Sequence, residues 1–137
     1  MDKITLKIII LENVEKVWKY YTEPNHIMKW NFTDPSWFCP KAENNLQVGG
    51  SFKYRMESKK ENFHFDFEGV YDEIIPLKLL KSHLIDGRTI ETQFHEIDGK
   101  TTEVIQIFQP ENDNLRDSQR NNWYAILDNF HKYVENH

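Results

Sequence analysis

The stretch that decides the fold is residues 116–135, RDSQRNNWYAILDNFHKYVE, which has the pattern of one long amphipathic helix. Its apolar stripe is formed by Trp123, Ile126, Leu127, Phe130 and Val134, which recur at helical spacing. A helix of about 20 residues is about 30 Å long, which is enough to cross a small sheet. Because one face of this helix is apolar, we expect it to pack on the apolar face of a sheet.

The region before this helix predicts a run of strands. Apolar and polar residues alternate with period two, which is typical of half-buried strands. Asp86-Gly87 and Asp98-Gly99 are hairpin signals, so neighbouring strands are expected to be antiparallel. The predicted strands lie at residues 4–10, 52–57, 63–75, 77–85, 90–95 and 102–108, with Pro76 ending the third of them. One further short strand is predicted after an aromatic, turn-rich loop at 31–40.

Two short helices are predicted between the first strand and the rest. Asn13 stands at the position of an N-cap, and the helix that follows it runs to about Thr22. Pro24 suits the first turn of a second helix that carries Ile27 and Trp30. The sequence therefore predicts an α+β fold: a curved antiparallel sheet of about seven strands, two short helices after the first strand, and a long C-terminal helix.

Composition limits the classes of protein. The chain has 137 residues, a net charge of −5 and one cysteine, Cys39. An acidic surface repels phosphate backbones, so no nucleic acid is expected as a partner. We expect no signal peptide and no membrane span, because no apolar stretch is long enough. These features predict a single domain over residues 1–137 in a cytoplasmic protein that is a monomer or a homodimer.

Short segments along nearly the whole chain together match the pattern of one protein family. They are Val17-Trp18, Tyr21-Thr22-Glu23-Pro24, His26-Ile27, Trp30-Asn31, Trp37, Pro40, Val48-Gly49-Gly50, Phe52, Tyr54-Arg55-Met56-Glu57, Phe65-Asp66-Phe67, Gly69, Tyr71, Asp86-Gly87-Arg88, Gln119-Arg120, Trp123, Ala125-Ile126-Leu127, Asn129-Phe130 and Tyr133-Val134-Glu135. With these residues the chain resembles the family named for the C-terminal domain of the activator of Hsp90 ATPase, within the SRPBCC, or START-like and birch-allergen-like, superfamily. The resemblance implies a helix-grip fold with a cavity between sheet and helix and, from the family's name, a chaperone as an alternative partner.

The pattern of large apolar residues on the inner face of the predicted sheet and helix alone favours a filled core, but the family resemblance implies that these residues form a cavity wall. Ligand sites are concave and mostly apolar, although the same residues also suit a solid core. Trp30 and Phe38, with Trp37, are placed near the mouth, as a gate or as a plug. The predicted ligand-binding residues are Trp30, Phe38, Phe52, Tyr54, Phe65, Phe67, Tyr71, Thr92, Phe94, Gln106, Phe108, Trp123, Leu127 and Phe130.

Two polar residues fall on this inner face by strand parity. Thr92 and Gln106 alternate with outward residues, and a buried amide needs a hydrogen-bond partner. The partner of Gln106 is expected to be either a ligand or a protein group such as Tyr54 or the backbone.

No catalytic, metal or cofactor motif is present. The six histidines lack metal-ligand spacing, and Cys39 is expected to be a small buried residue. Asp66 and Glu68 face away from the predicted cavity. The sequence therefore predicts non-catalytic binding of a hydrophobic or amphipathic small molecule. The alternatives are a chaperone-linked interaction module and, less favoured, an enzyme of the cyclase or hydratase type.

Overall fold

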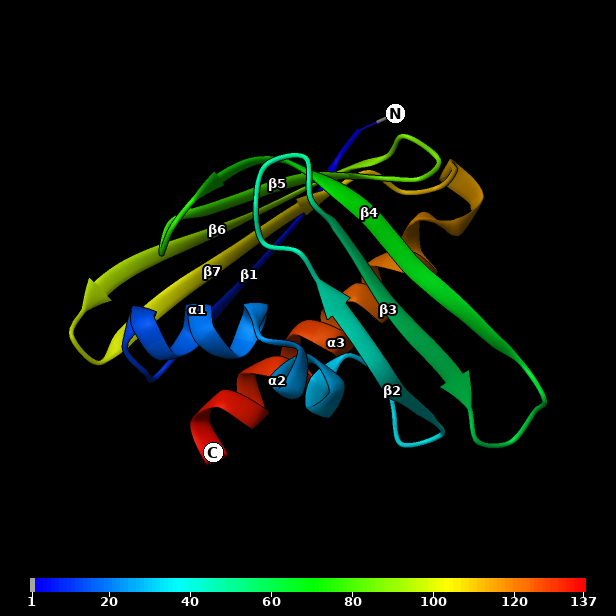
Figure 1. Ribbon diagram of the computed structural model, residues 1–137, viewed down its shortest axis with the longest axis horizontal. Coiled ribbons are helices and arrows are strands. Elements are labelled where there is room, and N and C mark those ends of the chain that lie inside the picture. The colour runs from blue at the N-terminus through cyan, green and yellow to red at the C-terminus, as the bar shows by residue number, and fades with distance from the viewer. Residues whose placement is uncertain (1) are drawn as a thin grey trace.

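One curved antiparallel sheet of seven strands forms the centre of the computed structural model, which describes residues 2–137 (Figure 1). The strands lie side by side in the order β1-β7-β6-β5-β4-β3-β2, and each pairs with its neighbour in antiparallel orientation. The first two strands of the chain are therefore the two edges of the sheet. The strands are β1 (Ile4–Ile10), β2 (Trp37–Asn44), β3 (Ser51–Ser58), β4 (His64–Ile75), β5 (Leu79–Leu84), β6 (Thr89–Asp98) and β7 (Thr101–Phe108).

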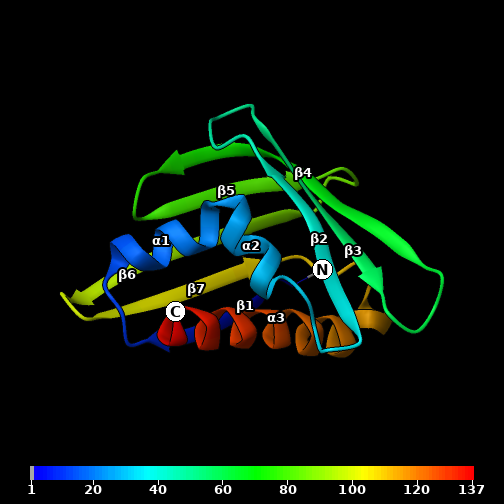
Figure 2. The same ribbon diagram turned by 60° about the horizontal axis from the view of Figure 1, so that its bottom comes forward.

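The helices pack against the inner face of the curved sheet, as Figure 2 shows. Helices α1 (Val14–Thr22) and α2 (Pro24–Trp30) lead the chain from one sheet edge to the other. The Oδ1 atom of Asn13 accepts a hydrogen bond of 2.8 Å from the backbone N–H of Lys16 and so caps α1. A 3-10 turn (Asp113–Leu115) precedes the long helix α3 (Arg116–Asn136).

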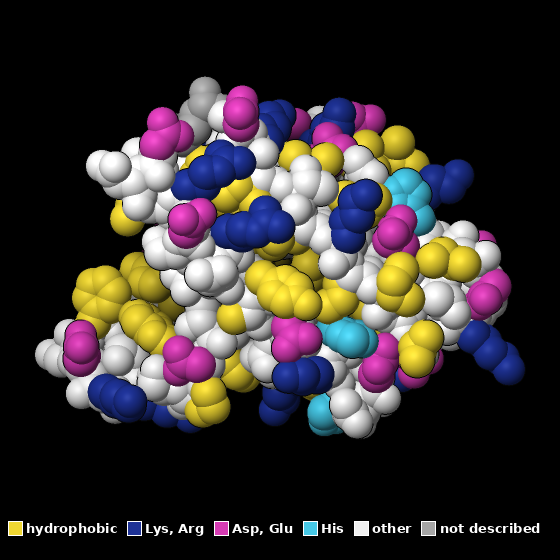
Figure 3. Space-filling view, turned by 180° about the vertical axis from the view of Figure 1, so that it is seen from behind, with side chains coloured by type: hydrophobic (Ala, Val, Ile, Leu, Met, Phe, Trp, Pro, Cys, Tyr) yellow, Lys and Arg dark blue, Asp and Glu magenta, His cyan; other side chains and the backbone are white. Residues whose placement is uncertain are grey.

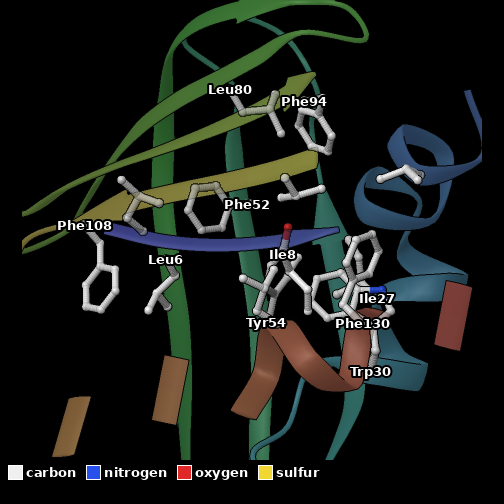
Figure 4. Close-up of a cluster of buried hydrophobic side chains, with 14 of the residues drawn as sticks. Leu6, Ile8, Ile27, Trp30, Phe52, Tyr54, Leu80, Phe94, Phe108 and Phe130 are labelled. Atoms are coloured by element: carbon white, nitrogen blue, oxygen red, sulfur yellow. The ribbon is translucent and has the colours of Figure 1, made fainter. Parts of the chain in front are cut away.

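The core lies between the sheet and the helices. Burial alternates along β1 and β7, where every second side chain points inward. Phe108 and Phe130 are each 1% exposed, and the rings of Phe130 and Trp30 lie 4.8 Å apart between centroids (Figure 4). Fully burying a large apolar side chain contributes roughly 1.5–3 kcal/mol, so these contacts fix α3 and α2 on the sheet.

Gly69 on β4 is required because its neighbours on β5 and β3 leave no room for a side chain. A Cβ atom at this position would lie 2.5 Å from the carbonyl oxygen of His83 and 2.7 Å from the ring of Phe52. Gly87 serves a different purpose, because its φ of +92° is the left-handed conformation that the β5–β6 hairpin needs.

The predicted helix-grip fold is confirmed, with two corrections at element boundaries. The segment 31–40 was expected as a loop, but β2 already begins at Trp37. Pro40 cannot donate a ladder hydrogen bond, and it lies within a register irregularity between Phe38 and Lys41 on this edge strand. β5 begins at Leu79 rather than Leu77, since Leu77 has a φ of +67°, which interrupts a strand.

Candidate functional site

A cavity of about 470 Å³ lies between the inner face of the sheet and α3. It is partly open to solvent, and two of its lining residues, Asp34 and Asn122, are exposed. Its volume falls within the usual range for small-molecule sites. The lining residues are Tyr21, Trp30, Asn31, Thr33, Asp34, Trp37, Tyr54, Met56, Phe65, Phe67, Arg88, Gln106, Gln119, Asn122, Trp123 and Ile126.

Aromatic rings from β3, β4 and α3 form the apolar wall. The rings of Tyr54 and Phe67 are stacked with centroids 6.2 Å apart, and Phe67 meets Trp123 edge-on at 5.8 Å. Trp123 also stacks on Phe108 at 4.1 Å, behind the wall. Trp123 is half-buried, and it borders the cavity as predicted for a wall residue.

A short chain of polar side chains lies at the floor of the cavity. Nε2 of Gln106 donates a hydrogen bond of 2.8 Å to the hydroxyl of Tyr21, and this hydroxyl lies 3.4 Å from Oγ1 of Thr92. The protein partner of Gln106 is therefore Tyr21 and not Tyr54. Burial raises the pKa of Tyr21, so its hydroxyl stays protonated near neutral pH.

The amide oxygen Oε1 of Gln106 has no hydrogen-bond partner among residues 2–137, although Gln106 is only 6% exposed. No fully buried side-chain nitrogen or oxygen in this range lacks a partner, so Oε1 must be accessible from the cavity. The floor thus offers an incoming molecule an unpaired acceptor in an otherwise apolar surrounding.

Charged and amide side chains also line the cavity. Asp34, in the connection from α2 to β2, accepts a hydrogen bond of 2.7 Å from the backbone N–H of Ser36. Its hydrogen bonds with Ser36 hold the pKa of the Asp34 carboxyl below its usual value. Arg88, Gln119 and Asn122 also line the cavity, from the β5–β6 hairpin and from α3.

The structure brings part of the predicted ligand-binding set to the cavity. Trp30, Tyr54, Phe65, Phe67, Gln106 and Trp123 line it. The following predicted residues do not line it: Phe38, Phe52, Tyr71, Thr92, Phe94, Phe108, Leu127 and Phe130.

Most of the predicted residues that do not line the cavity are covered by other side chains. Phe94 lies beneath Trp18 and Tyr21, with centroids 5.1 and 5.5 Å away, and Tyr21 also covers Thr92. Phe38 instead lies near the ammonium of Lys59, 6.0 Å from its ring centroid.

The remaining core positions are covered in the same way. Phe52 is enclosed by Tyr54, Phe67 and Tyr71, while Phe108 lies behind Trp123. Tyr71 donates a hydrogen bond of 2.6 Å to Oδ1 of Asn44. Leu127 and Phe130 are buried members of the core under α3.

Several lining residues were missing from the predicted set. Arg88 has the same strand parity as Ile90 and Thr92, and that signal would have placed it on the inner face. Tyr21 and Ile126 belong to apolar helix stripes, and Met56 to the inner face of β3. Thr33 and Asp34 come from a connection in which no periodicity marks an inward residue.

The histidines and Cys39 are the candidate residues for metal binding and nucleophilic catalysis. Within residues 2–137, no three His, Cys, Asp or Glu side chains gather as a metal-binding group. Burial raises the pKa of the Cys39 thiol to about 11, which keeps it protonated and unreactive. His26 lies away from the cavity, where its Nδ1 is 2.8 Å from the hydroxyl of Tyr133.

A second surface feature lies beside the opening. Phe63 and Phe65, at the tip of the β3–β4 hairpin, are 53% and 44% exposed, and both rings contact Trp37. Figure 3 shows apolar side chains gathered at the edge that carries this hairpin. We call Phe63, Phe65 and Trp37 the hairpin aromatic cluster. In the same range, residues 2–137, none of the helices is long and apolar enough to cross a membrane.

Comparison with known proteins places the chain in a family. The family model for the activator of Hsp90 ATPase homolog 1-like protein matches residues 13–135. The solution structure of the AHSA1-like protein from Aeromonas hydrophila has a TM-score of 0.90 and 32% identity, over 97% of this chain and 92% of that one. A protein from Cytophaga hutchinsonii has a TM-score of 0.83 and 42% identity, over 98% and 92% of the two chains.

A protein from Nitrosomonas europaea, at 18% identity and a TM-score of 0.83 over 98% of this chain and 94% of that one, shares the fold. The search of curated proteins found no match. The family match covers most of the chain and agrees with the observed sheet and grip helix, so this chain belongs to the activator of Hsp90 ATPase homolog 1-like family.

Proposed function

We propose that this protein binds a hydrophobic or amphipathic small molecule in the cavity between the sheet and α3, without transforming it. The observation that carries the proposal is the combination of an open cavity of about 470 Å³ and the unpaired Oε1 of Gln106 at its floor. Aromatic walls with a few placed polar groups are the usual chemistry of small-molecule sites. A molecule with an apolar body and a hydrogen-bond donor would match both features.

The ionisation of the lining groups favours binding over acid–base catalysis. Burial raises the pKa of Tyr21 and raises that of Tyr54 well above its usual range, so both are neutral donors at neutral pH. The carboxyl of Asp34 has a lowered pKa and is exposed, so it does not supply the protonated acid that a cyclase or hydratase needs. As the compartment we propose the cytoplasm, in keeping with the buried free thiol of Cys39.

The test is native mass spectrometry of protein purified without detergent, followed by titration with the neutral fluorescent probe Nile red. We expect an additional non-covalent mass or saturable probe binding. Ile126→Trp fills the cavity from α3 and should abolish both signals. Ile9→Trp, at a 44% exposed position on the outer face of β1, is the matched control and should leave them unchanged. A wild-type protein with neither signal would contradict the proposal.

A second function, interaction with an Hsp90-type chaperone, is favoured by the hairpin aromatic cluster. Exposed groups of large apolar side chains are typical of interaction surfaces. If this function holds, Phe63→Ser should weaken binding of a purified Hsp90 in a calorimetric titration. Ile85→Ser, at a 73% exposed position of the β5–β6 connection, should not change it. Absence of heat with the wild-type protein would exclude this function.

A further inference from the structure

We infer that the end of the cavity next to the β5–β6 hairpin is an anion subsite, in which Arg88, Gln119 and Asn122 hold the carboxylate of an amphipathic ligand. This inference rests on the proposed function, since it assigns the chemical class of the molecule that occupies the cavity.

Arg88 is the one lysine or arginine that lines the cavity among residues 2–137. It has the parity of the inward residues Ile90 and Thr92, and its side chain is 23% exposed. Its Nε donates a hydrogen bond of 2.7 Å to Oδ2 of Asp86, which fixes the guanidinium plane. The two terminal nitrogens of the Arg88 guanidinium have no hydrogen-bond partner in the described range. Their N–H groups therefore remain available to bind a carboxylate.

Gln119 and Asn122 add amide donors from α3. Oε1 of Gln119 accepts a hydrogen bond of 2.7 Å from the backbone N–H of Glu111, which leaves its Nε2 as the free end of the amide. Asn122 is exposed and precedes the wall residue Trp123. Both amides therefore present donors at the cavity, and carboxylates accept such hydrogen bonds.

Hydrogen bonds between the hairpin and the chain that leads into α3 place these three residues at the same end of the cavity. The backbone N–H of Thr89, next to Arg88, donates to Oε1 of Gln109 at 2.9 Å. Two residues after Gln109, the backbone N–H of Glu111 donates its hydrogen bond to Gln119 on α3.

The charged lining residues determine where the head group of the ligand binds. Asp34 enters the cavity lining from the α2–β2 connection, a different segment from the one that carries Arg88, and its lowered pKa keeps it ionised. A carboxylate is repelled by Asp34 and attracted by Arg88. Among the charged residues that line the cavity, the carboxylate therefore contacts Arg88, and the rings of Phe67 and Trp123 are left for the apolar tail.

The experiment compares decanoate with 1-decanol, which have the same chain length and differ in head-group charge, by isothermal titration calorimetry at low salt. We expect decanoate to bind the wild-type protein about tenfold tighter or more, as charge-assisted hydrogen bonds allow. Arg88→Gln should remove this preference while the affinity for 1-decanol stays within about twofold. Asn122→Asp, at an exposed position, should weaken decanoate alone.

Arg55→Gln is the matched control, because Arg55 is a cation of the outer sheet face, paired with Glu57, and should leave both affinities unchanged. Thermal melts establish that each variant is folded. If Arg88→Gln does not fold, the comparison of decanoate with 1-decanol is made on Asn122→Asp. Equal binding of the two probes, or a preference that survives both substitutions, would overturn the anion subsite but leave the cavity as a binding site. Failure of both probes to bind would count against the proposed function itself.

Discussion

Gln106 on β7 donates a hydrogen bond of 2.8 Å to the hydroxyl of Tyr21 on α1, and this contact joins the last strand of the sheet to its first helix at the floor of the cavity. The contact uses the Nε2 group of the Gln106 amide, and the Oε1 atom remains accessible from the cavity. One residue thus has a structural partner and a free acceptor at the same time.

We expect Gln106→Leu to destabilise the fold by about 1 kcal/mol, because it removes one hydrogen bond from the hydroxyl of Tyr21. That hydroxyl keeps its contact with Thr92, which limits the loss. Urea unfolding of Gln106→Leu, Tyr21→Phe and the double variant measures the coupling between the two residues. Strict additivity of the two single effects would show that the contact contributes nothing.

Trp123→Ala should cost about 2 kcal/mol, which is less than the roughly 3–5 kcal/mol expected for a fully buried aromatic residue. Trp123 stacks on Phe108 but is half-buried at the cavity wall. Phe130→Ala is the comparison, because Phe130 is 1% exposed and should cost more. Urea unfolding measures the free energy of unfolding of both variants. A larger loss of stability for Trp123→Ala than for Phe130→Ala would show that Trp123 is not the less buried of the two.

Gly69→Ala should be strongly destabilising, by roughly 1–3 kcal/mol, since its Cβ would overlap the carbonyl oxygen of His83 and the ring of Phe52. Gly99→Ala is a suitable control, because nothing lies within 4 Å of a Cβ atom there. Thermal melts of the two variants should differ clearly. A shift of similar size in both would mean that His83 and Phe52 lie further from Gly69 than described.

His26 should titrate below its usual pKa of about 6.5, chiefly because burial disfavours the imidazolium. A lowered pKa in the folded state means that the unfolded chain binds the proton more readily. The contribution of His26 to stability is therefore complete above pH 6.5 and is lost as the pH falls through the folded-state pKa. An NMR titration of the ring protons measures this directly, and a midpoint at or above 6.5 would disprove it.

Strand periodicity was sufficient to predict much of the fold. Ile4 and Ile10 on β1, and Val104 and Phe108 on β7, are buried where alternation predicted. The N-cap at Asn13 was also predicted, because its short side chain precedes a helical apolar stripe. These elements are local in origin, and local pattern therefore suffices to predict them.

The cavity was only partly predictable, because parity identifies the face of a side chain but not its depth. Phe67 and Phe94 are both on the inner face, yet Phe67 meets open space beside Trp123 while Phe94 is covered by Trp18. Asp34 comes to the opening from an irregular connection, where no periodic signal exists. Which rings line space and which fill the core depends on tertiary packing.

The most direct test of the central claim is a two-dimensional ¹H–¹⁵N NMR titration of the labelled protein with decanoate. Binding in the cavity predicts saturable shifts of the side-chain amides of Asn31, Gln106 and Asn122 and of the indole N–H of Trp123, all from cavity-lining residues. An unchanged spectrum, or shifts confined to the backbone amides of Phe63 and Phe65 at the hairpin tip, would contradict the account.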